Sequence, residues 1–481
     1  MHNEQVFTPE WVVLMMTIRL YGTHITGKHI IDNSCGDGAF LHWVVVNYIQ
    51  YFIWEDRGNK DKLKKELETY IHGIEIDEDL CKKCIERLDK CAAGVGIHNV
   101  NWDVKCADAL TTTEYDGKMD YVIGNPPYVN VHDFGNKYEQ YKSSRFIDKG
   151  MADLYLVFFD KGIEMLKDTG KLMYITPSSW TTSMAGHKFR EWLLENKTLQ
   201  SVIDMGHTKV FDNANTYTMI TSLTKTPNEK VEVFEFVEQY KDDYLQSYFD
   251  KYKRSIDTFE CNGNFYFNTT EEQIEDLRKI MSTNRKDHKI HVKNGLATLK
   301  DKLFVIEGGL EQYNLEIHKD NVRNLIKASN GERKHIIYPY DYNGNLLSFE
   351  QLTRKTEEYL LKRCHELSLK QKGVWWQYGR SQAIKDVPKM KMCVNNLIRT
   401  KDDIKLNIAQ PHNCVYSGFY ITIDDELLKQ CEVHPFKQIR DLLVSDRFVD
   451  YVKLIGKYKN GGYYTFSTKE IENFLNFFVK T

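Results

Sequence analysis

The chain contains 481 residues, of which 42% are hydrophobic and 28% are charged. This composition is typical of a globular protein of two or three domains, and it excludes collagen-like and intrinsically disordered chains. The net charge of −3 excludes a strongly basic nucleic-acid coat protein. No apolar run approaches the roughly 18–20 residues of a membrane helix, and no secretory signal opens the chain, so we expect a cytoplasmic protein without membrane contact.

Charge is unevenly distributed along the chain. Residues 1–250 contain 27 basic and 38 acidic residues, whereas residues 251–481 contain 38 and 30. The segment 351–400 alone has 11 basic against 4 acidic residues. A basic second half could bind a polyanion such as nucleic acid, although two domains with unequal surfaces would give the same counts.

Strand-like and helix-like segments alternate through the first 225 residues. Apolar runs predict strands at 28–32, 70–76, 120–125 and 171–177. Helical spacing follows the second strand at 77–91, and an amphipathic helix is predicted at 153–167. Such alternation predicts an α/β fold with a parallel sheet covered on both faces. Further strand-like runs follow at 202–205, 219–223 and 231–236.

The remainder of the chain differs in its sequence pattern from the first 225 residues. Residues 240–290 are polar, and Thr270 and Gln273 have the spacing of a capping box at the start of a helix. From Val292, short aromatic runs separated by Gly, Asn and Asp predict a mixed α and β domain. We therefore predict a first domain at 1–240, a helical bridge at 241–290 and a second domain at 291–481.

The strongest local motif is Gly124-Asn125-Pro126-Pro127-Tyr128, directly after an apolar strand. Two prolines fix a stiff turn at the carboxyl end of that strand, where ligands of open α/β sheets bind. The Asn125 amide oxygen and a backbone carbonyl could together accept both hydrogens of one NH2 group, while Tyr128 offers a stacking face. An ordinary proline-rich turn with a buried tyrosine is the alternative.

Two further features lie at strand ends. The segment 31–40, IDNSCGDGAF, contains glycines that would let the backbone approach a ligand, yet it is neither a GxGxxG fingerprint nor a phosphate-binding P-loop. Glu75 ends the second strand, where an acid can bind ribose hydroxyls or, alternatively, cap the next helix. The long separation of Asp32 and Glu75 is explained by a charged insertion that we predict to be a surface helix.

Together these motifs resemble those of gamma-class amino-methyltransferases that act on DNA adenine in restriction–modification systems. In order, the matching segments are FTPEWVV (7–13), DNSCGDGAF, GIEID, CADAL (106–110), GNPPYV, the helix at 153–167 and GKLMYITPSSW (170–180). The resemblance implies a Rossmann-like, S-adenosylmethionine-dependent methyltransferase with a mixed sheet, helices on both faces and a C-terminal mixed α+β target-recognition domain. It continues more loosely through NGLATLKDKLFVI, WWQYGRSQ and NGGYYTF.

The resemblance also implies roles for individual residues. Those around S-adenosylmethionine would be Thr8 at the methionine end, Asp32, Gly36 and Gly38 in the loop, Glu75 at the ribose, Ile76 and Phe158 on the two faces of the adenine, and Asp108 at its edge. Those around the target would be Asn125 and the Pro126 carbonyl at the amine, with Tyr128 and Phe211 stacking on the flipped base. The implied reaction is direct methyl transfer without a covalent intermediate, so Cys35 is expected to be a packed thiol.

The basic second half contains a cluster of charged and aromatic residues that could contact DNA phosphates or bases. Its members are Lys372, Trp375, Trp376, Tyr378, Arg380 and Lys385. Each could instead belong to the core or to an ordinary solvated surface. We expect no metal site, because Cys81 and Cys84 fall on a predicted helix without a second ligand pair.

Related chemistries remain as alternatives. The NPPY motif also occurs in enzymes that methylate release-factor glutamine or ribosomal RNA guanine, and a catalytically silent DNA-binding protein could share the core. Methylation of cytosine is disfavoured because its usual motif begins with Ser. The position of the first motif near residue 7 argues against an N-terminal nuclease. We expect a monomer that acts on double-stranded DNA and has no stable complex with any separate cognate endonuclease.

Overall fold

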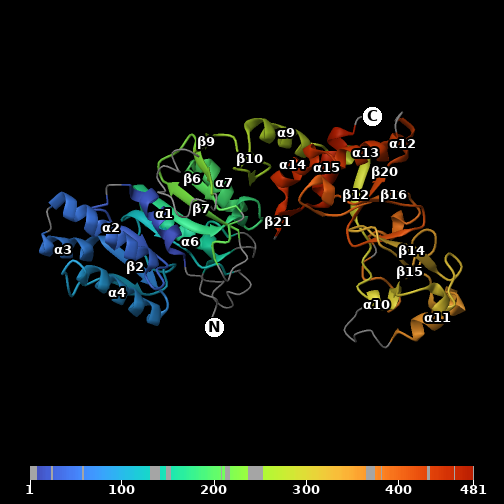
Figure 1. The fold of residues 1–481 in the computed structure, drawn as a ribbon, viewed down its shortest axis with the longest axis horizontal. Helices are drawn as coiled ribbons and strands as arrows, with labels where there is room; N and C mark the ends of the chain where they lie inside the picture. Colours follow the sequence, from blue (N-terminus) through green and yellow to red (C-terminus); the bar gives the residue numbers. More distant parts are fainter. Residues whose placement is uncertain are drawn as a thin grey trace. The chain divides into compact units, whose positions relative to one another are not determined.

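The computed structural model divides into two compact units, Met1–Ile274 and Glu275–Thr481 (Figure 1). The residues that it describes are 8–22, 25–56, 59–129, 141–147, 153–206, 208–211, 217–236, 253–364, 374–380, 382–430, 434–459 and 461–479. The division between the units falls within helix α9 (Glu271–Met281). The predicted capping box begins this helix, because the backbone amides of Thr270 and Gln273 each donate to the other residue's side chain, at 2.9 and 3.2 Å.

The first unit is built on a nine-stranded mixed sheet with the order β3-β2-β1-β4-β5-β7-β6-β8-β9. Its strands are β1 (Ile30–Asp32), β2 (Ile71–Glu75), β3 (Asp103–Cys106), β4 (Met119–Gly124), β5 (Leu166–Pro177), β6 (Leu199–Asp204), β7 (Thr218–Thr224), β8 (Val231–Glu235) and β9 (Arg254–Ile256). Strands β1 to β5 pair in parallel, and β7 runs antiparallel to both β5 and β6. All seven strand-like runs of the sequence are strands of this sheet. A separate hairpin joins β10 (Glu260–Cys261) to β11 (Asn264–Phe265).

Helices cover both faces of this sheet, as predicted. The helices of one face are α1 (Glu10–Tyr21), α2 (Ala39–Asp56), α3 (Lys60–Tyr70) and α4 (Glu78–Ala93), and those of the other are α6 (Leu154–Met165) and α7 (His187–Asn196). Successive residues of β1 point to opposite faces of the sheet. Ile30 packs in the core beneath α1 to α4, and Ile31 packs in the core beneath α6 and α7. The predicted inserted helix is α3, and its Leu63 and Leu67 are buried.

Helix α6 differs from the amphipathic helix predicted at 153–167, because every residue from Tyr155 to Met165 except Glu164 is buried. The ring of Phe159 packs on Tyr174 of β5 and stacks on Phe189 of α7 at 4.6 Å, while Val157 packs with Tyr141 and Ile147, so other segments besides the sheet cover α6. Its buried charges have partners. Asp160 accepts hydrogen bonds from the backbone N–H and Nε of Arg145, and Lys161 donates to Asp116 at 2.6 Å. The prediction of an amphipathic helix was therefore wrong, because Asp160 and Lys161 are buried and form ion pairs instead of facing solvent.

The second unit is a mixture of short strands and helices. Its sheets have the orders β12-β20-β16-β18, β13-β15-β14-β19 and β17-β22-β21. The strands are β12 (Ile290–Asn294), β13 (Val305–Ile306), β14 (Val322–Lys327), β15 (Arg333–Ile337), β16 (Lys391–Val394), β17 (Leu397–Ile398), β18 (Leu406–Ala409), β19 (Cys414–Tyr416), β20 (Phe419–Ile423), β21 (Lys457–Lys459) and β22 (Tyr463–Thr465). The helices are α10 (Asp301–Phe304), α11 (Arg354–Leu361), α12 (Asp425–Gln430), α13 (Pro435–Leu443), α14 (Asp446–Ile455) and α15 (Thr468–Phe478).

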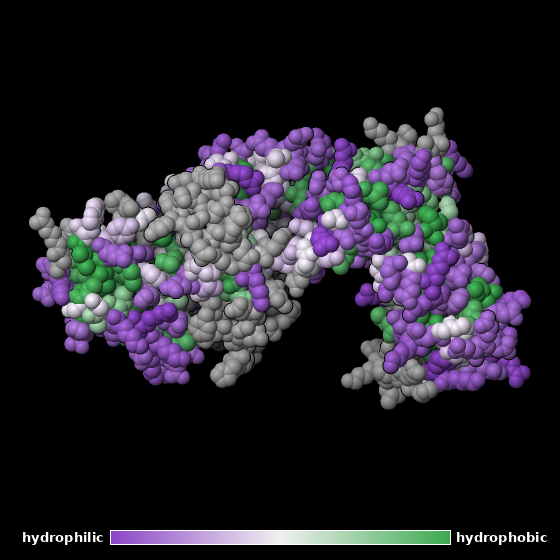
Figure 2. Space-filling view, viewed as in Figure 1, coloured by the Kyte–Doolittle hydropathy of each residue, from purple (hydrophilic) through white to green (hydrophobic). Residues whose placement is uncertain are grey.

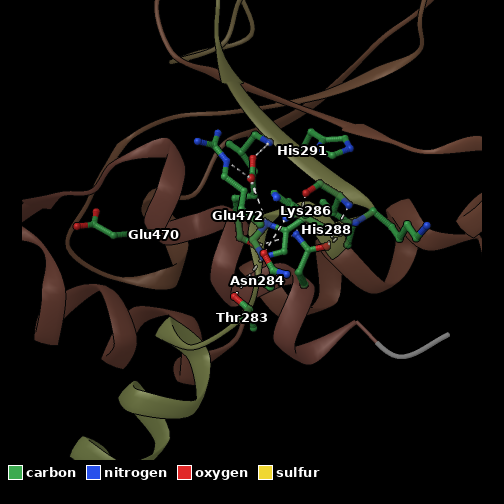
Figure 3. Close-up of polar contacts among 12 residues, drawn as sticks. Thr283, Asn284, Lys286, His288, His291, Glu470 and Glu472 are labelled. Carbon is green, nitrogen blue, oxygen red and sulfur yellow. Dashed lines mark hydrogen bonds and ion pairs between the residues drawn. The ribbon is translucent and has the colours of Figure 1, made fainter. Parts of the chain in front are cut away.

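A buried carboxylate fastens the beginning of the second unit to its last helix (Figure 3). Glu472 of α15 is 2% exposed and accepts a hydrogen bond from the backbone N–H of Val292 at 2.8 Å. It also contacts Nε of Arg285 at 3.0 Å and Nδ1 of His288 at 3.1 Å. Although burial raises the pKa of Glu472, these hydrogen bonds outweigh it and lower the pKa. Strand β12 is thereby fixed against α15 by side-chain contacts as well as by its pairing with β20.

Hydrophilic residues cover much of the face seen in Figure 2, with apolar residues in smaller patches. Within the described part of the chain, no helix is both long enough and apolar enough to cross a membrane.

Candidate active site

The glycine-containing loop and the turn Asn125–Tyr128 both lie where the strand order of the sheet reverses. From β1 the chain moves outward through β2 and β3, and it then returns to the other side of β1 as β4. Such a reversal leaves a crevice at the carboxyl ends of the strands, which is where ligands of open α/β sheets bind. The glycine-containing loop follows β1, and the turn Asn125–Tyr128 follows β4. The topology therefore places both motifs at one crevice.

Asp32 and Gly124 lie against each other at the ends of β1 and β4. Asp32 is 1% exposed, and its Oδ1 accepts a hydrogen bond from the backbone N–H of Ser34 at 3.0 Å. A Cβ atom on Gly124 would lie 2.7 Å from that same oxygen, so the residue before Asn125 has no room for a side chain. Burial of the carboxyl group raises the pKa of Asp32 to about 8.

The glycine-containing loop is fixed against β2 and α4. The backbone N–H of Cys35 donates to the carbonyl of Ile74 at 3.0 Å. Gly38 has φ +85°, and a Cβ atom there would lie 3.2 Å from Cα of Cys84 in α4. Gly36 has φ +53° and borders open space, because a Cβ atom there would meet nothing within 4 Å. Cys35 is buried, and its hydrogen bond with Cys84 together with burial raises the pKa of its thiol, which suits a packed residue.

Glu75 joins the end of β2 to this loop. One carboxylate oxygen accepts from the backbone N–H of Gly36 at 2.9 Å, and the other accepts from Ile76 at 2.8 Å and Asp77 at 3.0 Å. The N-cap of α4 is Asp77, which accepts from the N–H of Asp79 at 3.0 Å. Asp77, and not Glu75, therefore caps α4.

The residues expected around an adenine lie on three different elements. Ile76 follows β2 and is 59% exposed, whereas Phe158 lies in α6 and is 7% exposed. Asp108 follows β3, and its two oxygens accept from the N–H of Leu110 at 3.0 Å and the hydroxyl of Tyr141 at 2.9 Å. Sequence patterns did not predict a role for Tyr141, because it belongs to none of the motifs described above.

The turn after β4 contacts residues from three other parts of the chain. The amide of Asn125 donates to the hydroxyl of Thr8 at 3.1 Å. Tyr128 donates its hydroxyl hydrogen to the carbonyl of Ile175 at 3.2 Å, and its ring meets that of Phe211 edge-on at 6.0 Å. Phe211 is buried, whereas Asn125 and Tyr128 are half-buried and Pro126 is buried. The predicted target residues therefore form one connected group, in contact with Thr8.

The candidate DNA-contacting residues of the second unit occupy different environments. Tyr378 is buried, and its hydroxyl donates to the carbonyl of Ile337 at 2.5 Å, so packing accounts for this residue. Trp375 and Trp376 are half-buried against the same core, and Arg380 is exposed. Lys372 lies outside the described residues, and Lys385 is exposed. Within the described residues, no group of three or more His, Cys, Asp or Glu side chains is placed to hold a metal ion.

Sequence comparison relates the chain to restriction–modification methylases. Residues 19–211 match the family model described as Eco57I restriction-modification methylase. The chain is 24% identical over 455 residues to the type II restriction enzyme and methyltransferase RM.Eco57I of Escherichia coli, covering 75% of this chain and 45% of the relative. It is 25% identical over 417 residues to the type II methyltransferase M.BstVI of Geobacillus stearothermophilus, covering 78% and 72%. The chain thus spans less than half the length of the first of these relatives.

Solved structures show the same fold at lower identity. The type IIL restriction-modification enzyme MmeI, solved in complex with DNA, gives a TM-score of 0.62 at 12% identity and covers 96% of this chain and 65% of its own. A nuclease-deletion mutant of the type ISP enzyme LlaGI, solved with a DNA substrate mimic, gives 0.53 at 12% identity and covers 88% and 48%. Residues 19–211 therefore match the Eco57I restriction-modification methylase family, and the chain shares the mixed α/β fold of the restriction-modification enzymes MmeI and LlaGI.

Proposed function

We propose that this chain is a site-specific DNA methyltransferase that transfers a methyl group from S-adenosylmethionine to the N6 amine of a flipped-out adenine in duplex DNA. The observation that carries the proposal is the position of Asn125. Its turn lies at the reversal point of the sheet, beside the glycine-containing loop, and its amide is held by Thr8. The match of residues 19–211 to restriction-modification methylases supports DNA as the substrate.

The residues at the crevice fit S-adenosylmethionine, which would supply an electrophilic methyl group on its sulfonium. The open space beside Gly36 would let a ligand approach the backbone of the loop. Carboxylates at the ends of neighbouring strands, from Glu75 and Asp108, are acceptors suited to ribose hydroxyls and an adenine amine. Ile76 offers an exposed apolar surface beside them for one face of the adenine. Phe158 on the other face, and Thr8 at the methionine end, complete the proposed binding site.

The chain's own contribution to transfer would be to position and polarise the target amine. That nitrogen is a poor nucleophile because its lone pair is delocalised into the ring. Hydrogen bonds from the amine to Oδ1 of Asn125 and to the carbonyl of Pro126 favour a tetrahedral nitrogen and stabilise the positive charge that develops there. The half-buried ring of Tyr128 and the ring of Phe211, which meets it edge-on, would both stack on the flipped base. No covalent intermediate on the chain is needed.

Duplex DNA is the proposed partner of the second unit as well. Rotating a base out of the stack costs a few kcal/mol, which pocket contacts and protein–DNA contacts elsewhere must offset. Residues 251–481 carry the excess of positive charge, with 38 basic against 30 acidic residues. MmeI and LlaGI, which share the fold, were both solved with DNA or a DNA mimic. We further propose that the protein acts in the cytoplasm as a monomer, separately from any cognate endonuclease.

The test is modification sequencing of DNA from cells that express either the unaltered chain or the Asn125→Ala variant. We expect methyladenine at one recurrent sequence with the unaltered chain and none with the variant. Purified Asn125→Ala protein should still bind S-adenosylmethionine, as measured by calorimetry. Unmodified DNA from cells containing soluble, cofactor-binding protein would instead favour an RNA or protein substrate, or a silent DNA-binding protein.

A further inference from the structure

Leu299 is an exposed leucine held in a left-handed backbone conformation. It lies in the turn between β12 and α10 of the second unit, two elements that Figure 1 labels. Its φ is +54°, and 60% of its surface is exposed. A leucine adopts this conformation unfavourably, whereas Gly and Asn adopt it readily. Backbone strain of this kind persists where the surroundings impose it, and it is concentrated at functional sites.

The segment around residues 375–380 imposes this conformation from one side. The backbone N–H of Gly379 donates to the carbonyl of Thr298 at 2.7 Å, and Arg380 donates to Ala297 at 3.1 Å. A Cβ atom on Gly379 would lie 2.5 Å from Cδ1 of Leu299. The leucine side chain therefore rests directly on the backbone of Gly379, with its remaining surface in solvent.

A lysine fastens the same two segments together. Nζ of Lys300 donates to the carbonyls of Trp375 at 3.1 Å and Gln377 at 3.3 Å. The backbone N–H of Lys300 donates to the hydroxyl of Thr298 at 3.0 Å, which closes the turn below Leu299. Side-chain and backbone contacts thus hold the turn from both ends. Leu299 is consequently a rigid apolar tip, and little conformational entropy is left for it to lose on binding.

Cations accompany this tip. Lys302 and Arg380 are both exposed, and neither forms an ion pair with another described residue. The acid in the same turn, Asp301, shares a hydrogen bond with the hydroxyl of Thr298. The charged side chains around Leu299 are therefore mostly positive, and Leu299 is a large apolar side chain exposed among them, at the edge of a hollow lined by residues 296–303. This combination suits DNA better than a protein partner, because apolar wedges enter a base step while neighbouring cations contact phosphates.

We propose that Leu299 is a wedge that enters the base stack of duplex DNA, with Lys302 and Arg380 on the flanking phosphates. This inference rests on the proposed function, since it supplies part of the unstacking that base rotation requires. Partial unstacking of a step kinks the duplex and lowers the cost of turning a nearby base outward. The wedge would thus assist catalysis without contacting the reacting atoms.

The test compares Leu299→Asn with Leu299→Met in the full chain. Asparagine removes the apolar tip and suits φ +54°, so the midpoint of thermal unfolding should stay equal or rise. Methionine keeps the apolar reach. The probes are a random-sequence duplex and a duplex that carries the methylated sequence with 2-aminopurine in place of the target adenine. We expect Leu299→Asn to bind the second duplex at least about 10-fold more weakly, with lower 2-aminopurine fluorescence, and Leu299→Met to stay within about 2-fold.

The two cations provide an independent measurement. Lys302→Gln and Arg380→Gln should each reduce the slope of log K against log salt concentration by about 1, whereas Leu299→Asn should leave that slope unchanged. If Leu299→Asn and the unaltered chain show equal affinity and equal fluorescence, the proposal that Leu299 enters the base stack is wrong. A contact with a protein partner would then be the better explanation of its exposure. Failure of the unaltered chain to methylate any DNA would count against the proposed function instead. The wedge would then be judged on the random-sequence duplex, which Leu299→Asn should bind more weakly than Leu299→Met and which needs no methyl transfer.

Discussion

The amide nitrogen of Asn125 donates a hydrogen bond to the hydroxyl oxygen of Thr8 at 3.1 Å and so joins residues that lie 117 positions apart. Because the NH2 end of the amide is used in this contact, its oxygen is turned the opposite way. An amide whose oxygen must accept from a target amine needs this orientation. The beginning of the chain thus orients the turn at the end of β4.

Thr8→Ala should slow methyl transfer by removing this contact. Loss of one hydrogen bond of about 1 kcal/mol corresponds to a decrease of roughly 3- to 10-fold in the single-turnover rate. Thr8→Ser keeps the hydroxyl group and should retain most of the rate. Rate and S-adenosylmethionine affinity are measured separately. A weaker affinity with an unchanged rate would show that Thr8 acts on the cofactor and does not orient Asn125.

Glu75→Ala should weaken binding of S-adenosylmethionine by at least about 10-fold. The substitution removes the proposed ribose acceptor and also releases the backbone N–H of Gly36, so the glycine-containing loop loses this contact with β2 and keeps the one between Cys35 and Ile74. Asp77→Ala is the matched control. It removes the N-cap of α4, should cost about 1 kcal/mol of stability and should leave cofactor affinity intact. Calorimetry decides, and an unchanged affinity for Glu75→Ala contradicts the ribose role.

Gly124→Ala should destabilise the first unit. The new methyl group would lie 2.7 Å from Oδ1 of the buried Asp32, so the ends of β1 and β4 must separate. Overpacking of this kind costs about 1–3 kcal/mol in denaturant unfolding, and cofactor affinity should fall with it. Gly309→Ala is the control, since its nearest neighbour is the flexible carboxylate of Glu311 at 3.1 Å, and it should cost less than about 0.5 kcal/mol.

Asp32 should make the ligand-free protein less stable as pH rises. Burial raises its pKa to about 8 from an ordinary value of 3.8. The folded state therefore holds a proton that the unfolded chain releases, and this contribution to stability is full below pH 4 and is lost as pH rises to about 8. Asp32→Asn should lack this component. Denaturant unfolding at pH 5 and pH 8 measures it, and an identical pH dependence in both proteins would contradict the assignment.

The strands and the order of motifs could be predicted because both depend on local sequence. An apolar run ending at Gly124 predicts a buried strand wherever it lies in the sheet, and the position of Glu75 after its own strand follows in the same way. The contacts of Thr8 with Asn125 and of Tyr141 with Asp108 could not be predicted, since they join segments that only the folded chain brings together.

Local sequence patterns also could not predict which charged and aromatic side chains become buried by contacts with distant segments. Tyr378 stood out in the sequence as an aromatic residue within a basic cluster, yet the fold uses its ring in the core and its hydroxyl on the carbonyl of Ile337. The charges Asp160 and Lys161 suggested a solvated helix face for a similar reason. Their partners, Arg145 and Asp116, lie in segments whose position no helical periodicity encodes.

The burial of α6 on all sides has a consequence for hydrogen exchange. Its backbone amides can meet deuterated solvent only if α6 separates from the sheet and from the other segments that pack on it, α7 and residues 141–147. That separation would also break the ion pairs of Asp160 and Lys161. Local opening of α6 should therefore cost nearly as much as unfolding the whole first unit. The amides of Leu156 and Phe159 should be among the last in the chain to exchange, and their rates should report the global stability of that unit.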